Sequence, residues 1–430
     1  MINKYKYYAA SLFAVYSALI IYYQPPFGLM DDFKNIEHIQ NLNQDFFGYY
    51  MAYFYERTFE KGLLQPFYLL QMYFQYFSNS PIFVYLQNLL IVFLSHYLFV
   101  KGISKYVKIN YVISLLVFLI FPFTNDLFVH PSLQEKYAFL IFGTVLLMLN
   151  KEKKYNVIIF ILSLIVPLIK LQGTVLIFII LSIHYRSRTI DTLFATLGFL
   201  LGIGLQTYIT FFIEAEYRIR NSFENILSNL QHPVNLFYLL IIFYFIFFLF
   251  KENESDFIKL SIAVSSLAIL FIYINFYILG YLLSTYAFFL SLIIPIITNK
   301  YETKFNLSES KQITIFILVL IFSIFQFFMP RIQRWSDLSE VYSQLEDYEY
   351  GSIYFCSEEA TIYLNKIINP NNNLIFVNNV SEISSLNNQY LITDEFQCES
   401  FGKDLPPTCI EKSVFKTRFS KILIKKISCT

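Results

Sequence analysis

The sequence predicts a polytopic α-helical membrane protein that carries a small α/β domain at its C-terminus. Of its 430 residues 56% are hydrophobic and only 15% are charged, whereas soluble domains carry about a quarter charged residues. Apolar runs long enough to cross a bilayer recur over residues 1–329. Beyond residue 330 the pattern changes to short apolar runs bounded by Gly and Asn, which is typical of strands.

Eleven segments have the length and apolar character of membrane-spanning helices. A spanning helix needs about 20 largely apolar residues, or slightly fewer at the short end of the range. We therefore predict spans near residues 7–23, 81–100, 111–128, 136–149, 155–169, 171–184, 190–213, 234–250, 258–277, 279–298 and 312–329. The first run leads into YYQPPFG and not into a small-residue cleavage motif, so we interpret it as a retained anchor.

Lys and Arg residues set the predicted orientation, because short cytoplasmic loops are enriched in them. With the N-terminus inside, every basic cluster falls on the cytoplasmic side: Lys4, Lys6, Lys101, Lys105, Lys108, Lys151, Lys153, Lys154, Arg186, Arg188, Lys251, Lys259, Lys300, Lys304 and Lys311. A single interrupted crossing over 155–184 would invert everything downstream, whereas two short crossings keep both flanking clusters inside. We predict two crossings, a cytoplasmic N-terminus and an extracytoplasmic tail.

The cysteines provide an independent indication of where the tail lies. All four, Cys356, Cys398, Cys409 and Cys429, fall in the tail and none in the predicted spans. Such clustering is typical of an oxidising compartment. The alternative is that four ordinary buried thiols happen to cluster there. The connectivity stays open, although a bridge between Cys398 and Cys409 would close a Pro-containing loop.

The chain divides into a membrane domain, residues 1–329, and a C-terminal domain, residues 330–430. Within the former, residues 24–80 form a long first outer loop. Its segment DFFGYYMAYFYERTFEKGLL mixes aromatic clusters with charges, which suits an amphipathic helix in the membrane interface. Pro66 then starts a new helix or bend. These helices are expected to dip into the membrane without crossing it.

The tail follows a strand and helix alternation. GSIYFC, NNLIFVNN and QYLITDE are predicted strands, and EEATIYLNKI between the first two has helical spacing. This is a βαβαβ order, which predicts a small α/β domain. The final segment, SVFKTRFSKILIKKISC, alternates in the manner of a hairpin or one long strand.

Two adjacent carboxylates, Asp31 and Asp32, follow directly on the first predicted span. Holding two like charges ionised next to hydrocarbon is costly, which points to a function. An acceptor hydroxyl is a poor nucleophile at neutral pH, and a carboxylate can take its proton. We therefore predict Asp31 as a catalytic base, with Asp32 holding the acceptor or tuning its neighbour. The alternative is that both acids only cap the following helix.

Several cations are predicted on the same side as this acidic pair. If a sugar is supplied on a polyprenyl phosphate, cationic side chains at the interface would stabilise the departing phosphate. The predicted phosphate-binding residues are Arg57, Lys61, Lys170, Arg218 and Arg220, and Lys136 lies on the same side. As alternatives, Arg218 and Arg220 are solvated loop charges, and Lys170 only extends its ammonium group from a helix end towards water.

Three further polar residues are candidates for acceptor or substrate binding: Glu135, His130 and His232. Both histidines stand next to a Pro in predicted outer loops, which also suits a structural role. Glu135 has an alternative role in pairing with Lys136 or with helix ends.

The organisation as a whole resembles the GT-C superfamily of polytopic glycosyltransferases, which includes the protein mannosyltransferases and the lipid A aminoarabinose transferases. The residues that carry the resemblance are MDD in the first loop, KGLLQPFY after it and LIKLQG near the middle spans. The resemblance implies lipid-phosphate sugar donors and a general-base or acceptor-binding role for Asp31 or Asp32. No cofactor is predicted. A divalent metal stays open, although later outer loops show no clear second acidic motif.

We therefore predict a glycosyltransferase that moves a sugar from a polyprenyl-phosphate donor to a glycan, lipid or protein acceptor in cell-envelope assembly. Membrane lipids are further partners, and a net charge of +1 gives no sign of nucleic-acid binding. Two other classes stay open: a polymerase or ligase of lipid-linked glycans, and a transporter or flippase. The abundance of Ile, Asn, Lys, Phe and Tyr favours an AT-rich, bacterial genome, and hence a bacterial inner membrane.

Overall fold

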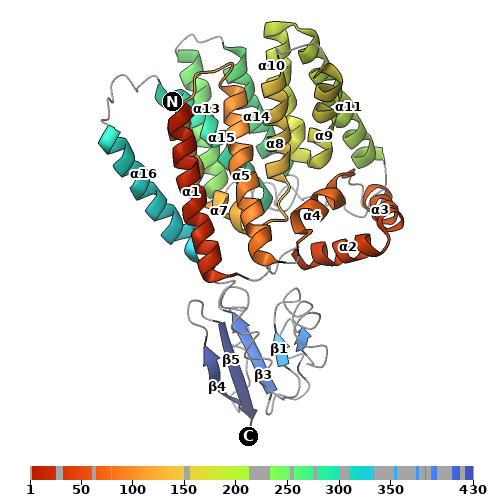
Figure 1. Cartoon of the computed structure of the whole chain (residues 1–430), viewed down its shortest axis with the longest axis vertical. Coiled ribbons are helices and arrows are strands. Elements are labelled where there is room, and N and C mark those ends of the chain that lie inside the picture. Colours follow the sequence, from red (N-terminus) through yellow and green to blue (C-terminus); the bar gives the residue numbers. More distant parts are fainter. Residues whose placement is uncertain are drawn as a thin grey trace. The chain divides into compact units, whose positions relative to one another are not determined.

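A computed structural model gives the fold of the chain, which is mostly helical (Figure 1). It describes residues 2–25, 32–60, 64–78, 80–149, 155–212, 233–251, 256–274, 279–299, 309–330, 332–333, 353–355, 374–376, 383, 389–394, 409–416 and 422–429. The chain forms two compact units. One comprises Met1–Ser17, His38–Phe77 and Val84–Ser323, and the other comprises Ala18–Glu37, Ser78–Phe83 and Ile324–Thr430.

Every predicted span has a helical counterpart. The helices are α1 (Ile2–Tyr23), α5 (Pro81–Ile103), α6 (Tyr111–Ile120), α7 (Pro122–Val129), α8 (Glu135–Met148), α9 (Asn156–Ile169), α10 (Ile177–Ser187), α11 (Ile190–Phe212), α13 (Pro233–Lys251), α14 (Phe257–Ile274), α15 (Leu279–Asn299) and α16 (Glu309–Ser323), with a π-helical turn η4 (Ile324–Phe328) after α16. Three described stretches, Pro81–Ile103, Ile190–Ile209 and Pro233–Lys251, are long and apolar enough to cross a membrane, and other helices are shorter but apolar. These features indicate a membrane protein.

One predicted span is not a single helix. Segment 111–128 breaks at Phe121, whose backbone is extended (φ −71°, ψ 121°), and α7 starts at Pro122. A proline has no N–H to donate and is tolerated in the first turn of a helix, so it starts α7 where it could not continue α6. Apolarity runs unbroken through this segment, which is why the pattern of hydrophobic residues alone predicted one helix.

The region 155–184 forms two helices that are separated at Lys170. Here the backbone is extended (φ −159°, ψ 150°), and a short 3₁₀ turn, η3 (Leu171–Leu176), leads into α10. Gly173 lies so close to α9 that a Cβ atom there would meet the carbonyl oxygen of Val166 at 2.2 Å. A residue without a side chain is therefore required where η3 folds back on α9.

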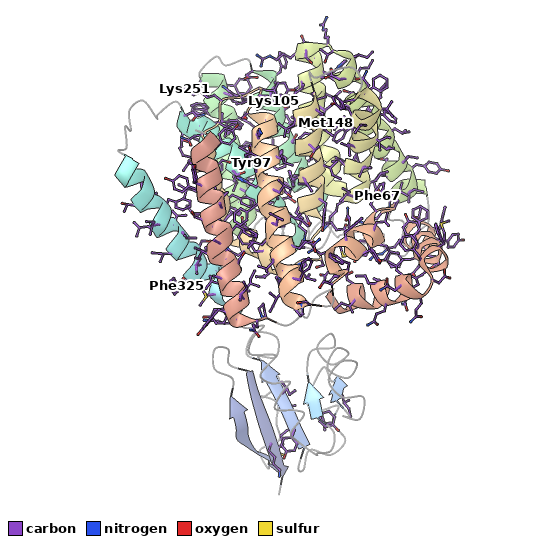
Figure 2. The ribbon with its side chains drawn as sticks, viewed as in Figure 1. Phe67, Tyr97, Lys105, Met148, Lys251 and Phe325 are labelled. Atoms are coloured by element: carbon purple, nitrogen blue, oxygen red, sulfur yellow. The ribbon has the colours of Figure 1, made fainter. Side chains whose placement is uncertain are left out.

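Basic residues that the structure describes in the predicted cytoplasmic loops, Lys105 and Lys251 among them, lie towards one end of the helical bundle (Figure 2). Lys105 Nζ donates to the carbonyls of Leu146 (3.0 Å) and Leu149 (2.8 Å) at the end of α8. Burial raises the pKa of Tyr106 to about 12, and the nearby carboxylate of Asp191 adds to this shift. Figure 2 shows Lys105, Met148 and Lys251 towards this end and Phe67 away from it. Lys105 and Lys251, which the sequence assigns to the same side of the membrane, therefore also lie towards the same end of the bundle.

The first outer loop forms a compact group of helices: α2 (Asp32–Gln44), α3 (Phe46–Tyr55), a π-helical turn η1 (Glu56–Glu60) and α4 (Tyr68–Tyr76). Leu42, Tyr53 and Leu69 form its core, against which Tyr49, Tyr50, Tyr68 and Tyr73 pack. A second apolar cluster joins the first outer loop to α9 and α11 of the bundle. Its members from the loop are Phe54, Leu64 and Phe67, and its members from the bundle are Leu164, Leu168 and Ile209. Pro66 lies in the turn before α4, as predicted.

One face of α3 and η1 exposes a row of large apolar side chains. Phe47, Met51, Tyr55 and Phe59 follow at intervals of four residues and are 78%, 58%, 59% and 47% exposed. Residues four apart share a helix face. Such a face suits the predicted position in the membrane interface, where aromatic side chains are favoured.

The tail forms a five-stranded mixed sheet with strand order β2-β1-β3-β5-β4. Its strands are β1 (Ile353–Phe355), β2 (Leu374–Phe376), β3 (Gln389–Asp394), β4 (Cys409–Lys416) and β5 (Ile422–Cys429). The strand β1 is parallel to β2 and β3, whereas β4 and β5 form an antiparallel hairpin. All three predicted strands and the C-terminal hairpin are confirmed. The predicted helix EEATIYLNKI lies outside the described residues.

Side chains on both faces of the sheet are buried at β3. Leu391 and Ile392 are consecutive in β3 and both are 0% exposed, and consecutive strand residues point to opposite faces. Cys409 is disulfide-bonded, and none of the cysteines in the described part of the chain is a free thiol. The oxidising compartment of the tail stays a prediction.

The arrangement of the helix ends predicts opposite accessibility for two exposed positions. Asn43→Cys in α2 should react with a membrane-impermeant thiol reagent in intact cells. Lys108→Cys, which is in a basic loop, should react only after permeabilisation, because basic loops stay in the cytoplasm. Labelling of both variants, or of neither, in intact cells would contradict this topology.

Candidate functional site

Several predicted site residues lie outside the described part of the chain: Asp31, Lys61, Arg218, Arg220 and His232. Asp32 is the first residue of α2, and only its backbone is described. The structure therefore bears directly on Arg57, His130, Glu135 and Lys170.

Glu135 and Lys170 form an ion pair between two helix ends. The distance from Lys170 Nζ to Glu135 Oε1 is 2.5 Å, and the two side chains are 17% and 0% exposed, respectively. Glu135 is the first residue of α8, and Lys170 follows the last residue of α9. A carboxylate at a helix N-terminus and an ammonium group at a C-terminus both complement the helix dipole. The pair therefore holds the ends of α8 and α9 together.

This partner stands at the end of α9, in keeping with the alternative that Glu135 pairs with helix ends. Pairing with Lys136 was one alternative, but neighbouring residues of a helix point in different directions. The sequence contains no local signal for the observed pair, because its members are 35 residues apart. It also shows that Lys170 does more than extend its ammonium group towards water.

Lys136 is completely buried beside this pair. Its Nζ donates to Asn88 Oδ1 and to the carbonyl oxygen of Pro131, both at 2.5 Å. The amide nitrogen of Asn88 in turn donates to the carbonyls of Leu127 and Phe128 at 2.7 and 2.8 Å. The end of α7 thus orients Asn88, and Asn88 orients Lys136. Hydrogen bonds of this kind are what allow an ammonium group to be buried.

Gln75 connects the first outer loop to the same region. Its Oε1 accepts a 2.6 Å hydrogen bond from the hydroxyl of Tyr137, and its Nε2 donates to the carbonyl of Val84 at 3.1 Å. Three helices, α4, α5 and α8, therefore meet there. We refer to Gln75, Asn88, Glu135, Lys136, Tyr137 and Lys170 as the polar cluster.

His130 lies in the turn before α8, where its carbonyl accepts from the backbone N–H of Leu133 at 3.2 Å. The turn leads through Pro131, whose carbonyl oxygen contacts Lys136. The backbone around His130 thus helps to shape the polar cluster, in keeping with the structural alternative for this residue.

Arg57 belongs to a different group of side chains. Its Nε donates to the Tyr53 hydroxyl at 2.8 Å, and its guanidinium carbon lies 4.7 Å from the centre of the Tyr68 ring. Burial raises the pKa of Tyr53 to about 12, although the positive charge of Arg57 acts against the shift. Arg57 therefore holds η1 against α3 and α4 by hydrogen bonding and by cation–π attraction.

The polar cluster contains ammonium donors of the kind that bind anions. It contains two ammonium groups, of Lys136 and Lys170, and one carboxylate, of Glu135. Lys170 is the partly exposed cation and so can reach a ligand. Within the described residues, no group of three or more His, Cys, Asp and Glu side chains could hold a metal ion.

Comparisons of the chain with models of protein families, with curated proteins and with solved structures give no match. The resemblance to the GT-C superfamily therefore remains a prediction from the sequence, and the argument for function rests on the polar cluster.

A double-mutant cycle tests the ion pair. Glu135→Gln and Lys170→Met should each lower the free energy of unfolding, because each leaves a charge in a poorly solvated place. The double variant should lose less free energy of unfolding than the two single variants together, and the difference, the coupling energy, should be about 1–3 kcal/mol. Unfolding in detergent measures all four proteins.

The matched control combines Glu135→Gln with Lys101→Met, whose charge belongs to the last turn of α5. Distant, independent sites are additive. The effects of Glu135→Gln and Lys101→Met on the free energy of unfolding should therefore add. If the effects of Glu135→Gln and Lys170→Met also add, the ion pair does not contribute to stability.

Proposed function

We propose that this protein is a membrane glycosyltransferase that takes a sugar from a polyprenyl-phosphate donor and transfers it to an acceptor hydroxyl. The observation that carries the proposal is the pair of ammonium groups in the polar cluster, those of Lys136 and Lys170, at the ends of α8 and α9 that lie away from the basic loops. A membrane enzyme that releases a lipid phosphate needs cations at such a place.

The reaction assigns a separate task to each group. The bond between the anomeric carbon and the phosphate oxygen breaks, and its electron pair stays on the phosphate. The acceptor oxygen forms a new bond to the anomeric carbon, and its proton passes to Asp31 or Asp32. Lys170 donates to the leaving phosphate, and the buried charge of Lys136 strengthens the local potential. Stabilising charge that develops at the leaving group lowers the barrier.

The first outer loop supports this assignment. Gln75 attaches its last helix, α4, to the polar cluster. The exposed row from Phe47 to Phe59 suits contact with lipid.

Binding of the leaving group is the direct test of this function. Purified protein in lipid nanodiscs should bind a long-chain polyprenyl monophosphate, and Lys170→Ala should weaken binding about 10–100-fold, the equivalent of one charge-assisted hydrogen bond. Lys101→Ala, at the other end of the bundle, is the control and should bind normally. Equal affinities of the wild type and Lys170→Ala would remove the basis of the proposal.

The acidic pair is tested by Asp31→Asn and Asp32→Asn. Asn caps a helix about as well as Asp, so a capping role predicts normal turnover. A base that cannot accept a proton should instead lower turnover about 10²–10⁴-fold at an unchanged thermal midpoint. Turnover is measured as polyprenyl phosphate released from a panel of polyprenyl-phosphate hexoses and pentoses. Two fully active variants would leave the acids with a structural role only.

A further inference from the structure

Each of two buried amide side chains near the polar cluster has one polar atom without a hydrogen bond. Gln71 and Gln134 are 9% and 3% exposed. In the part of the chain that the structure describes, Gln71 Oε1 and Gln134 Nε2 have no hydrogen-bond partner. A buried polar atom without a partner costs about 1–3 kcal/mol. These two atoms therefore point to a bound group.

Both amides lie close to the contact between α4 and α8. Gln71 precedes Gln75 by four residues on the same face of α4, and Gln75 accepts from Tyr137. Gln134 precedes Tyr137 by three residues and directly precedes Glu135. Each amide is therefore about one helical turn, roughly 5.4 Å along its helix, from the Gln75–Tyr137 contact. Gln134 occupies the N-cap position of α8, yet its side chain makes no capping hydrogen bond.

We infer that Gln71 and Gln134 bind hydroxyl groups of the transferred sugar, and that this sugar is uncharged. The inference rests on the proposed function and names the substrate class of the same site. It assigns the phosphate to Lys170 and the sugar to the two amides.

The chemistry of the two atoms selects a hydroxyl group over a phosphate. Gln134 Nε2 is a donor and Gln71 Oε1 is an acceptor. An ionised phosphate accepts hydrogen bonds but does not donate them, so it suits only the nitrogen atoms of the two amides. A hydroxyl group donates and accepts, and so it satisfies both amides. Because both amides are neutral, they suit a hexose or pentose with free hydroxyl groups better than an amino sugar or a sugar acid.

The experiment compares two ligands that differ only in the sugar. Affinities for polyprenyl monophosphate and for polyprenyl-phosphate glucose are measured in nanodiscs for the wild type, Gln71→Leu, Gln134→Leu and the control Gln44→Leu, which changes an exposed residue of α2. The wild type and the control should prefer the glucosylated lipid. Each of the other variants should lose about 5–100-fold of that preference, with an unchanged affinity for the bare lipid phosphate.

Thermal stability without ligand provides a second readout. Because leucine removes a polar atom that has no partner and keeps a similar volume, Gln134→Leu should keep or raise the thermal midpoint. A lower midpoint would mean that the amide has a structural partner, and would overturn the inference.

The outcomes separate the inference from the proposed function. If the wild type binds the bare lipid phosphate but does not prefer the glucosylated form, the inference alone is overturned. The same holds if Gln71→Leu and Gln134→Leu keep the wild-type preference for the glucosylated lipid. A water molecule in place of the sugar would produce this second result. A wild type that binds neither lipid overturns both proposals.

Discussion

The pairing of Glu135 with Lys170 is the constraint on which the arrangement of the helix ends depends. An apolar helical body cannot hold a charge without a partner, because transfer of an ion out of water is costly. The pair meets this requirement by joining the start of α8 to the end of α9. The close return of the chain at Gly173 follows from it, since η3 must leave Lys170 in an extended conformation and pack against α9 at once.

The other polar contacts build outward from that pair. Asn88 accepts from Lys136 and donates to carbonyl oxygens at the end of α7. The helix α7 exists as a separate element because the helical segment is interrupted at Phe121 and Pro122, so this interruption contributes to the site. Gln75 extends the network to the first outer loop. Two ammonium groups are thereby fixed close to the ends of α8 and α9, and this is the physical basis of the functional proposal.

Local features of the fold could be predicted from the sequence, whereas pairings across long distances could not. Apolar runs predicted the positions of the helices. Clusters of Lys and Arg predicted which loops lie on the same side. Alternation of residues located the strands and the β4–β5 hairpin. The pair Glu135–Lys170 and the contact of Asn88 with Lys136 join residues 35 and 48 positions apart, which no local pattern indicates. The unpartnered atoms of Gln71 and Gln134 become visible only once burial is known.

A structure of the protein in a lipid nanodisc with bound polyprenyl monophosphate, determined by electron cryomicroscopy, tests the central claim most directly. The account predicts density for the phosphate within hydrogen-bonding distance, about 3 Å, of Lys170 Nζ. It also predicts that the prenyl chain leaves this site towards the lipid. Density for the phosphate at the basic loops around Lys101 and Lys105, with the polar cluster unoccupied, would contradict the account.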